Sequence, residues 1–256
     1  MGPRTTLKRR HSRGSLAEKA YLRVRDGILQ GEFPLGAVLS RRNLAKEFGM
    51  SFLPMSEALQ RLEVEGLVES KPRVGTRVRI PTLQDVRESY IIREALESQS
   101  ARLFAEKSSS LEQMELRRMA EHLDELYDHC AHEQVDPDFL YSVHTYHLQF
   151  HMRIAECTGC IALRDAIEKN QVLVFNWLFD TVAERRTLPP HFHAELIQAL
   201  SSKDPEVADD AMRKHIRYGL DQVLQRIQPQ LDHDSWRLKQ SERESRPESA
   251  IANGKR

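Results

Sequence analysis

The sequence predicts a mainly α-helical protein with an N-terminal winged helix-turn-helix (α-helical with a small β-hairpin wing) and a C-terminal all-α bundle of six helices. Two observations predict this arrangement. In the first 80 residues, helix caps, glycine stops and one hairpin pattern follow each other in winged-helix order. After residue 81, apolar residues recur at helical spacing, and no strand pattern of any length appears.

The composition is typical of a soluble protein that needs no disulfides. Apolar residues make up 40% of the chain, and no apolar run reaches the roughly 18 residues that a transmembrane helix needs. No apolar segment follows the basic N-terminus, which argues against a secretory signal. The three cysteines, Cys130, Cys157 and Cys160, cannot all pair. We therefore expect a protein of the reducing cytoplasm.

The first predicted helix lies in "LAEKAYLRVRDGILQ". Leu16, Ala20, Val24 and Ile28 recur every four residues, which places them on one helical face. Gly31 then ends the pattern, as glycine commonly does just past a helix.

Two short helices should follow as a helix-turn-helix. Ser40 is a plausible N-cap for the first, which ends at Gly49, and Ser51 is a plausible N-cap for the second, which ends at Gly66. Pro54 falls in the first turn, where proline is tolerated. The second helix has a buried stripe of apolar residues, Met55, Leu59 and Leu62.

A small β-hairpin completes the first domain at "LVESKPRVGTRVRI". Two apolar residues precede a Pro-Arg-Val-Gly turn, and Val78 and Ile80 follow it in alternation with arginines. In a winged helix, the second helix of the pair enters the DNA major groove and the wing follows the backbone. The pattern also fits a small α+β domain of another purpose.

Charge is distributed unevenly although the chain is neutral overall. Residues 1–80 contain 16 Lys and Arg against 8 Asp and Glu, a net of +8, so of the 38 of each in the chain residues 81–256 keep 22 against 30, a net of −8. A basic first domain favours a polyanionic partner. Residues 1–15 hold five cations and no acid, which predicts a disordered basic arm.

In this interpretation, the chain after the arm divides into a winged helix-turn-helix domain at 16–81, a helical domain at 82–228 and a polar tail at 229–256 that is expected to be disordered. Breaks at Ser, Pro and Gly positions separate the helices. The predicted helices are 84–107, 111–132, 137–158, 160–184, 190–202 and 204–228.

Histidines form the main candidate site. His144, His147 and His151 fall within about 60° on one helical face. His193 and His215 lie about ten residues to either side of the turn at 202–205, so two antiparallel helices would bring them to similar heights. His147, His151, His193 and His215 could then converge on a divalent transition metal, with Zn²⁺ or Ni²⁺ favoured. The alternative is a set of surface or core histidines, and His144 fits either a supporting or a surface position.

At this point the chain resembles a known family. Residues 20–80 are similar to the GntR-type winged-helix transcription factors in "ILQGEFPLGAVLSRRNLAKEFGMS", "PMSEALQRLEVEGLV" and "RVGTRV". Residues 85–228 resemble the FadR-subfamily effector domain, called FCD, in "IREALESQSARLFAE", "FHMRIAECTG" and "HAELIQAL…DPEVADDAMRKHI". The resemblance implies a homodimeric DNA-binding regulator, here expected to be a repressor. A small, often carboxylated metabolite binds the helical domain of such proteins, many of which also hold a divalent metal there.

The recognition helix departs from the family pattern Ser-Arg-Thr-Pro-x-Arg-Glu-Ala-Leu. Phe52 and Ser56 occupy the two arginine positions, which should change the preferred operator and weaken binding by about 1–3 kcal/mol per lost contact. Ser56 and Gln60 can still donate to base edges, and Phe52 either packs on a thymine methyl or lies on the surface. The expected DNA-binding residues, whose cations are alternatively solvated surface charges, are Arg41, Arg42, Lys46, Ser51, Phe52, Ser56, Gln60, Arg61, Arg73, Gly75 and Arg77.

The same resemblance bears on the helical domain. His151, His193 and His215 match the three family histidines, while His147 stands where an aspartate is expected. Arg93 matches the family's helical-domain arginine and is expected to pair with an effector carboxylate, unless it forms a surface i,i+4 pair with Glu97. A second effector-binding candidate is Asn176, which lies in an apolar run.

Two other classes of protein fit the sequence less well. A helical metalloenzyme would use the same histidines, but the motif is not His-Glu-x-x-His and supplies no general base between them. A purely structural or protein-interaction domain would not need a basic winged helix. Cys157 and Cys160 form a single CxxC, which is weak evidence for redox sensing. We therefore expect a regulator with no catalytic residues.

Overall fold

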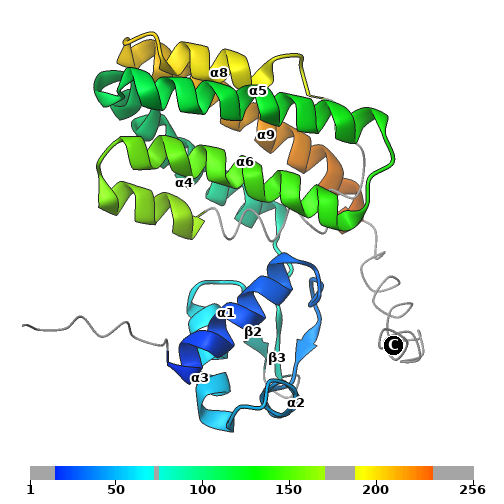
Figure 1. Ribbon diagram of the computed structural model, residues 1–256. Coiled ribbons are helices and arrows are strands. Elements are labelled where there is room, and N and C mark those ends of the chain that lie inside the picture. The colour runs from blue at the N-terminus through cyan, green and yellow to red at the C-terminus, as the bar shows by residue number, and fades with distance from the viewer. Residues whose placement is uncertain (1–14, 72–74, 171–187, 233–256) are drawn as a thin grey trace, which may run out of the picture. The chain divides into compact units, whose positions relative to one another are not determined.

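The computed structural model of the chain describes residues 15–71, 75–170 and 188–232. They divide into two compact units, of which the first ends at Arg79 and the second begins at Ile80 (Figure 1). The predicted arm at 1–15 lies almost wholly outside the described residues, as do positions 233–256 of the predicted tail.

The N-terminal unit has the predicted winged helix-turn-helix order. Its elements are α1 Leu16–Leu29, β1 Val38–Leu39, α2 Arg41–Glu47, α3 Phe52–Val64, β2 Val68–Lys71 and β3 Gly75–Val78. The strands form an antiparallel sheet in the order β1-β3-β2, with Val68 opposite Val78. The two-residue strand β1 was not predicted, because two residues are too short to produce an alternating pattern.

Local chemistry explains the helix-turn-helix. The Ser40 side chain accepts a hydrogen bond from the backbone N–H of Asn43 and so caps α2, whereas the Ser51 side chain makes no capping hydrogen bond at α3. Gly49 has a φ of +62°, a left-handed conformation that suits glycine and permits the tight turn between the helices. Helix α3 packs on α1, and its Met55 and Leu62 are fully buried.

The C-terminal unit contains helices and no strand among its described residues. It comprises α4 Leu83–Lys107, α5 Ser110–His132, α6 Pro137–Cys157, a helical stretch at 161–170, α8 Phe192–Leu200 and α9 Pro205–Asp232. The bounds agree with the predicted ranges to within a few residues; positions 171–184 of the predicted fourth helix lie outside the described part. Helix α9 continues past Pro229, since one missing N–H weakens a helix without necessarily ending it.

Capping boxes fix where two of these helices begin. Thr82 and Asp85 exchange hydrogen bonds at the start of α4, and Ser109 and Glu112 do the same at α5. Among the described helices, none is both long and apolar enough to cross a membrane.

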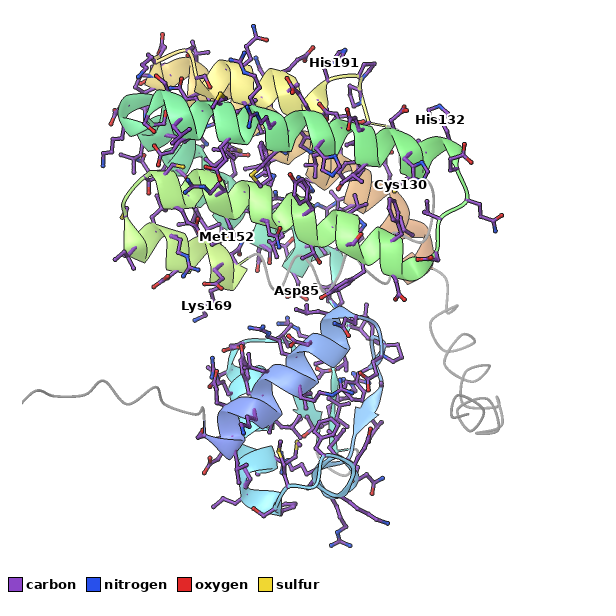
Figure 2. The ribbon with its side chains drawn as sticks, viewed as in Figure 1. Asp85, Cys130, His132, Met152, Lys169 and His191 are labelled. Carbon is purple, nitrogen blue, oxygen red and sulfur yellow. The ribbon has the colours of Figure 1, made fainter. Side chains whose placement is uncertain are left out.

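The bundle core positions the histidines. Helix α4 packs along α9 and α6, and α5 packs on α6 and α8 (Figure 1). Phe104, Phe150 and Leu123 are fully buried between these helices. Side chains fill the space between the helices of this unit (Figure 2). Imidazoles on α6, α8 and α9 lie close together in the bundle.

Candidate metal centre and DNA-binding face

Three imidazoles meet in the core of the helical unit. His147 and His151 lie one turn apart on α6, and His215 comes from α9. The Nε2 atom of His151 is 2.9 Å from Nε2 of His147 and 3.3 Å from Nε2 of His215. Tetrahedral nitrogens bonded to Zn²⁺ at 2.0–2.1 Å are about 3.3 Å apart. The ligand atoms of all three side chains lie within 4.8 Å of one another, so this histidine triad could hold a metal ion.

The surroundings of the triad favour neutral imidazoles, the form that binds a metal ion. Burial, followed by the neighbouring imidazoles, lowers the pKa of His147 and of His215 well below the ordinary value of 6.5. Burial also lowers the pKa of His151, although Glu97 partly offsets the effect. Neutral imidazoles keep the nitrogen lone pairs that a metal needs.

Partners on the far side of the rings hold the imidazoles in place. Nδ1 of His151 lies 2.7 Å from a carboxylate oxygen of Glu97, and Nδ1 of His147 lies 3.0 Å from the hydroxyl of Tyr127. Both rings therefore turn Nε2 toward the centre of the triad. Carboxylate and hydroxyl partners of this kind are the usual support of metal-binding histidines.

His193 adjoins the triad without belonging to its tightest group. It is fully buried on α8, and its ring centroid lies 4.9 Å from that of His147 and 5.3 Å from that of His215. Its Nδ1 lies 2.7 Å from Oδ1 of Asp124, which also accepts from the backbone N–H of His193. Sequence reasoning missed Asp124, because nothing in the pattern links it to a residue 69 positions later.

Arg93 and Glu97 form a buried ion pair beside the triad. Nε of Arg93 donates to Glu97 at 2.8 Å, and a terminal nitrogen of Arg93 lies 3.4 Å from Nε2 of His151. The alternative of a surface pair is wrong, because the two side chains are only 9% and 3% exposed. Burial alone would raise the pKa of Glu97, but Arg93 and then His151 outweigh it and bring that pKa to about 2. The other effector candidate, Asn176, lies outside the described residues.

A cavity of about 740 Å³ opens next to this centre, between α5 and the start of α8. Asp124 and Tyr127, which contact His193 and His147, are part of its lining. His132 and His191 line the cavity at one end of these helices (Figure 2). Carboxylates of Glu121, Glu125 and Asp128 also line it, so its electrostatic potential favours cations.

The predicted DNA-binding residues of the helix-turn-helix lie mostly on the surface. Ser51, Phe52 and Gln60 are exposed along α3, and Ser56 is half-buried between them. Three of the predicted DNA-binding residues are cations on α2. Arg42 and Lys46 are exposed, and Arg41 donates to the Thr76 hydroxyl at 3.3 Å.

Two predicted phosphate contacts already have acidic partners. Arg61 donates to Glu18 at 2.6 Å, and its guanidinium lies 3.6 Å from the ring centroid of Tyr21. Arg77 donates to Glu69 at 2.6 Å. Both arginines therefore also fasten neighbouring elements together. In the wing, Gly75 is exposed with a φ of +97°, and Arg73 lies outside the described residues.

The cysteine pair is poorly suited to redox sensing. Cys157 is buried, and desolvation is the main cause that raises the pKa of its thiol to about 12. A thiol that stays protonated is a weak nucleophile, so oxidation at this position is slow.

Comparisons with known proteins agree with this arrangement of domains. Residues 16–78 match the family model "Bacterial regulatory proteins, gntR family", and residues 88–218 match the FCD domain model. The "Probable D-xylose utilization operon transcriptional repressor" of Paenarthrobacter nicotinovorans is 31% identical over 74% of this chain and 80% of its own. The HTH-type transcriptional repressor RspR of Escherichia coli K12 is 24% identical over 78% of this chain and 85% of its own.

Solved structures show the same fold. A structure described as a transcriptional regulator GntR from Rhodococcus sp. RHA1 covers 82% of this chain and 98% of its own, with 21% identity and a TM-score of 0.67. The E. coli McbR/YncC structure covers 83% and 98%, with 22% identity and a TM-score of 0.63.

Proposed function

Because this chain belongs to the gntR family of bacterial regulatory proteins and carries an FCD domain, we propose that it is a metabolite-responsive repressor whose helical domain holds a divalent metal. The family consists of DNA-binding transcriptional regulators and not of enzymes, which removes the metalloenzyme alternative. The observation that carries the metal proposal is the convergence of three imidazoles, two buried and one half-buried, whose ligand atoms lie within 4.8 Å of one another.

The metal would be bound by His147, His151 and His215, with His193 as the fourth ligand. Three or four neutral imidazoles suit Zn²⁺ or Ni²⁺, and the absence of a carboxylate among the ligands weakens the case for harder ions. The carboxylates of Glu97 and Asp124 would not bind the metal themselves. They would contact Nδ1 of His151 and of His193 and so orient these two rings. The acidic cavity beside Asp124 raises the local concentration of cations near the centre.

The effector would be a small carboxylate. Arg93 is the cation that faces the triad, and a guanidinium binds a carboxylate through two parallel hydrogen bonds. The metal ion and the Arg93 guanidinium would bind the carboxylate of the effector together. Asn176 is a second candidate residue for contact with the effector.

DNA would bind at α3, with α2 and the wing contacting phosphates. One winged helix covers a single half-site, so a palindromic operator requires a homodimer. The partners on this proposal are therefore double-stranded operator DNA, a small carboxylate and a second copy of the chain, and the location is the cytoplasm.

Metal analysis of the full-length chain tests the centre. After loading with Zn²⁺ or Ni²⁺ and dialysis, we expect about one ion per chain, as for a single site. His151→Ala should abolish retention, whereas the matched control His122→Ala, which alters a half-exposed histidine on α5, should leave it unchanged. If His147→Ala retains the ion at full affinity, the ligands would be His151, His193 and His215. Equal retention by wild type and His151→Ala would refute the metal site.

DNA binding is tested separately with genomic fragments. Binding should weaken steeply as salt increases, because phosphate contacts release counterions. A carboxylate that releases the DNA should do so only in protein that retains Arg93. Absence of any salt-sensitive binding would refute the regulator proposal whatever the metal content.

A further inference from the structure

The N-terminal end of α3 presents an apolar surface instead of the cations that commonly recognise guanine. Phe52 is 57% exposed and Leu53 is 66% exposed, although both are large apolar side chains. They occupy the first two positions of the helix. In a helix-turn-helix, residues at this end of the second helix contact base edges in the major groove.

Helix α3, all of whose residues the structure describes, contains a single cation, Arg61. That guanidinium is held away from the apolar end by Glu18 at 2.6 Å and by Glu65 at 3.2 Å, and it stacks over Tyr21. Arginine and lysine make the commonest specific contacts to guanine. The helix therefore presents no unengaged cation for a guanine contact.

The groups that α3 does present form one row. Phe52, Ser56 and Gln60 are spaced by four residues and fall within about 80° around the helix. Phe52 supplies apolar area, Ser56 a hydroxyl and Gln60 an amide. An apolar side chain can contact the thymine methyl, and glutamine pairs with the N6 and N7 atoms of adenine.

We propose that this row recognises thymine and adenine: Phe52, with Leu53 beside it, packs on thymine 5-methyl groups, and Gln60 hydrogen-bonds adenine. The inference rests on the proposed DNA-binding function and names the chemistry of its operator. Duplex DNA is the occupant that fits this surface, because Arg42 and Lys46 are exposed on the preceding helix and complement the phosphates.

The size of the effect follows from the methyl group alone. Burial of one CH₂-sized apolar group contributes about 0.8 kcal/mol, which corresponds to about a fourfold change in affinity. A change of this size is measurable when a single methyl is removed from an otherwise identical site. Replacement of thymine by deoxyuridine removes that methyl and leaves the base-pairing edge intact.

The experiment begins with selection of bound duplexes from a random library by the full-length protein. We expect half-sites rich in thymine and adenine. Fluorescence anisotropy then compares the selected duplex with duplexes in which single thymines are replaced by deoxyuridine. At one or two positions, deoxyuridine should weaken wild-type binding about fourfold.

Variants assign the effect to the proposed side chain. Phe52→Ala should bind the thymine duplex more weakly and lose its sensitivity to deoxyuridine. Val64→Ala, which alters another exposed apolar residue at the far end of α3, should retain that sensitivity.

Four outcomes would overturn the inference. Guanine-dependent half-sites, or equal affinity for thymine and deoxyuridine at every position, would refute it while leaving the DNA-binding function intact. Retained deoxyuridine sensitivity in Phe52→Ala would refute the role of that residue. Failure to bind any duplex in a salt-sensitive manner would instead refute the proposed function, and with it this inference.

Discussion

Replacement of Glu97 by glutamine should destabilise the helical unit by about 3 kcal/mol. The carboxylate is 3% exposed and lies between Arg93 and His151. The pKa of Glu97 falls from 4.5 to about 2, and a difference of about 2.5 units corresponds to about 3 kcal/mol of preferential stabilisation of the charged form. Loss of one partner from a buried ion pair gives a similar figure of about 3–5 kcal/mol. Two independent arguments therefore agree on the magnitude.

The assay is urea unfolding of chelator-treated protein at pH 7, monitored by far-UV circular dichroism. With a slope of about 2–3 kcal/mol per molar urea, the Glu97→Gln midpoint should fall by about 1 M or more. Glu206→Gln is the matched control, because Glu206 forms an ion pair with Arg102 but is 77% exposed, so its loss should change the midpoint little. A loss below about 1 kcal/mol in Glu97→Gln would refute the reasoning.

The same contacts give a pH dependence with a defined sign. A carboxyl group whose folded-state pKa is depressed stabilises the fold above its unfolded pKa and loses that contribution as the pH falls through the folded value. The difference between wild type and Glu97→Gln should therefore be full above pH 4.5 and shrink toward pH 2. The substitution also places an amide, instead of a carboxylate, beside Nδ1 of His151, which should disturb the orientation of that ring.

Three further results are expected. Asp124→Asn should lower metal affinity about 10–100-fold in titration calorimetry, because it removes the support of His193; unchanged affinity would exclude His193 as a ligand. A thiol reagent at pH 7.4 should modify Cys160 well before Cys157, whose thiol pKa is about 12, as peptide mass spectrometry can verify; rapid labelling of Cys157 would contradict its burial. Arg61→Ala should destabilise the winged helix by about 1 kcal/mol in thermal unfolding, since the guanidinium stacks on Tyr21. An unchanged unfolding midpoint would show that this contact does not stabilise the domain.

Local signals account for the parts of the fold that the sequence predicted. Ser40 and Gly49 mark the two ends of α2 to within two residues, so caps and stops define this helix without tertiary information. Histidine spacing, together with the family resemblance, predicted that α6, α8 and α9 would contribute to one centre. The caps and stops depend only on neighbours in the chain.

The supporting partners were not predictable in the same way. Glu97 lies on a helix whose register against α6 depends on packing of the whole bundle, and its pairing with Arg93 looked like an ordinary surface pair. Tyr127 reaches His147 across 20 residues and Asp124 reaches His193 across 69. Such contacts arise from tertiary packing, which leaves no periodic trace in a single sequence.

The distance along the chain between His151 and His215 has a mechanical consequence. These residues are 64 positions apart, and their rings are brought together only when α6 and α9 both pack on α4 in the folded bundle. An ion bonded to both would act as a reversible cross-link that closes a long loop, and loop closure of this length removes much entropy from the unfolded chain. Because binding also favours the folded state by mass action, ion concentration would set how often the bundle opens. The free energy of unfolding of the helical domain would thus increase with the concentration of the metal ion.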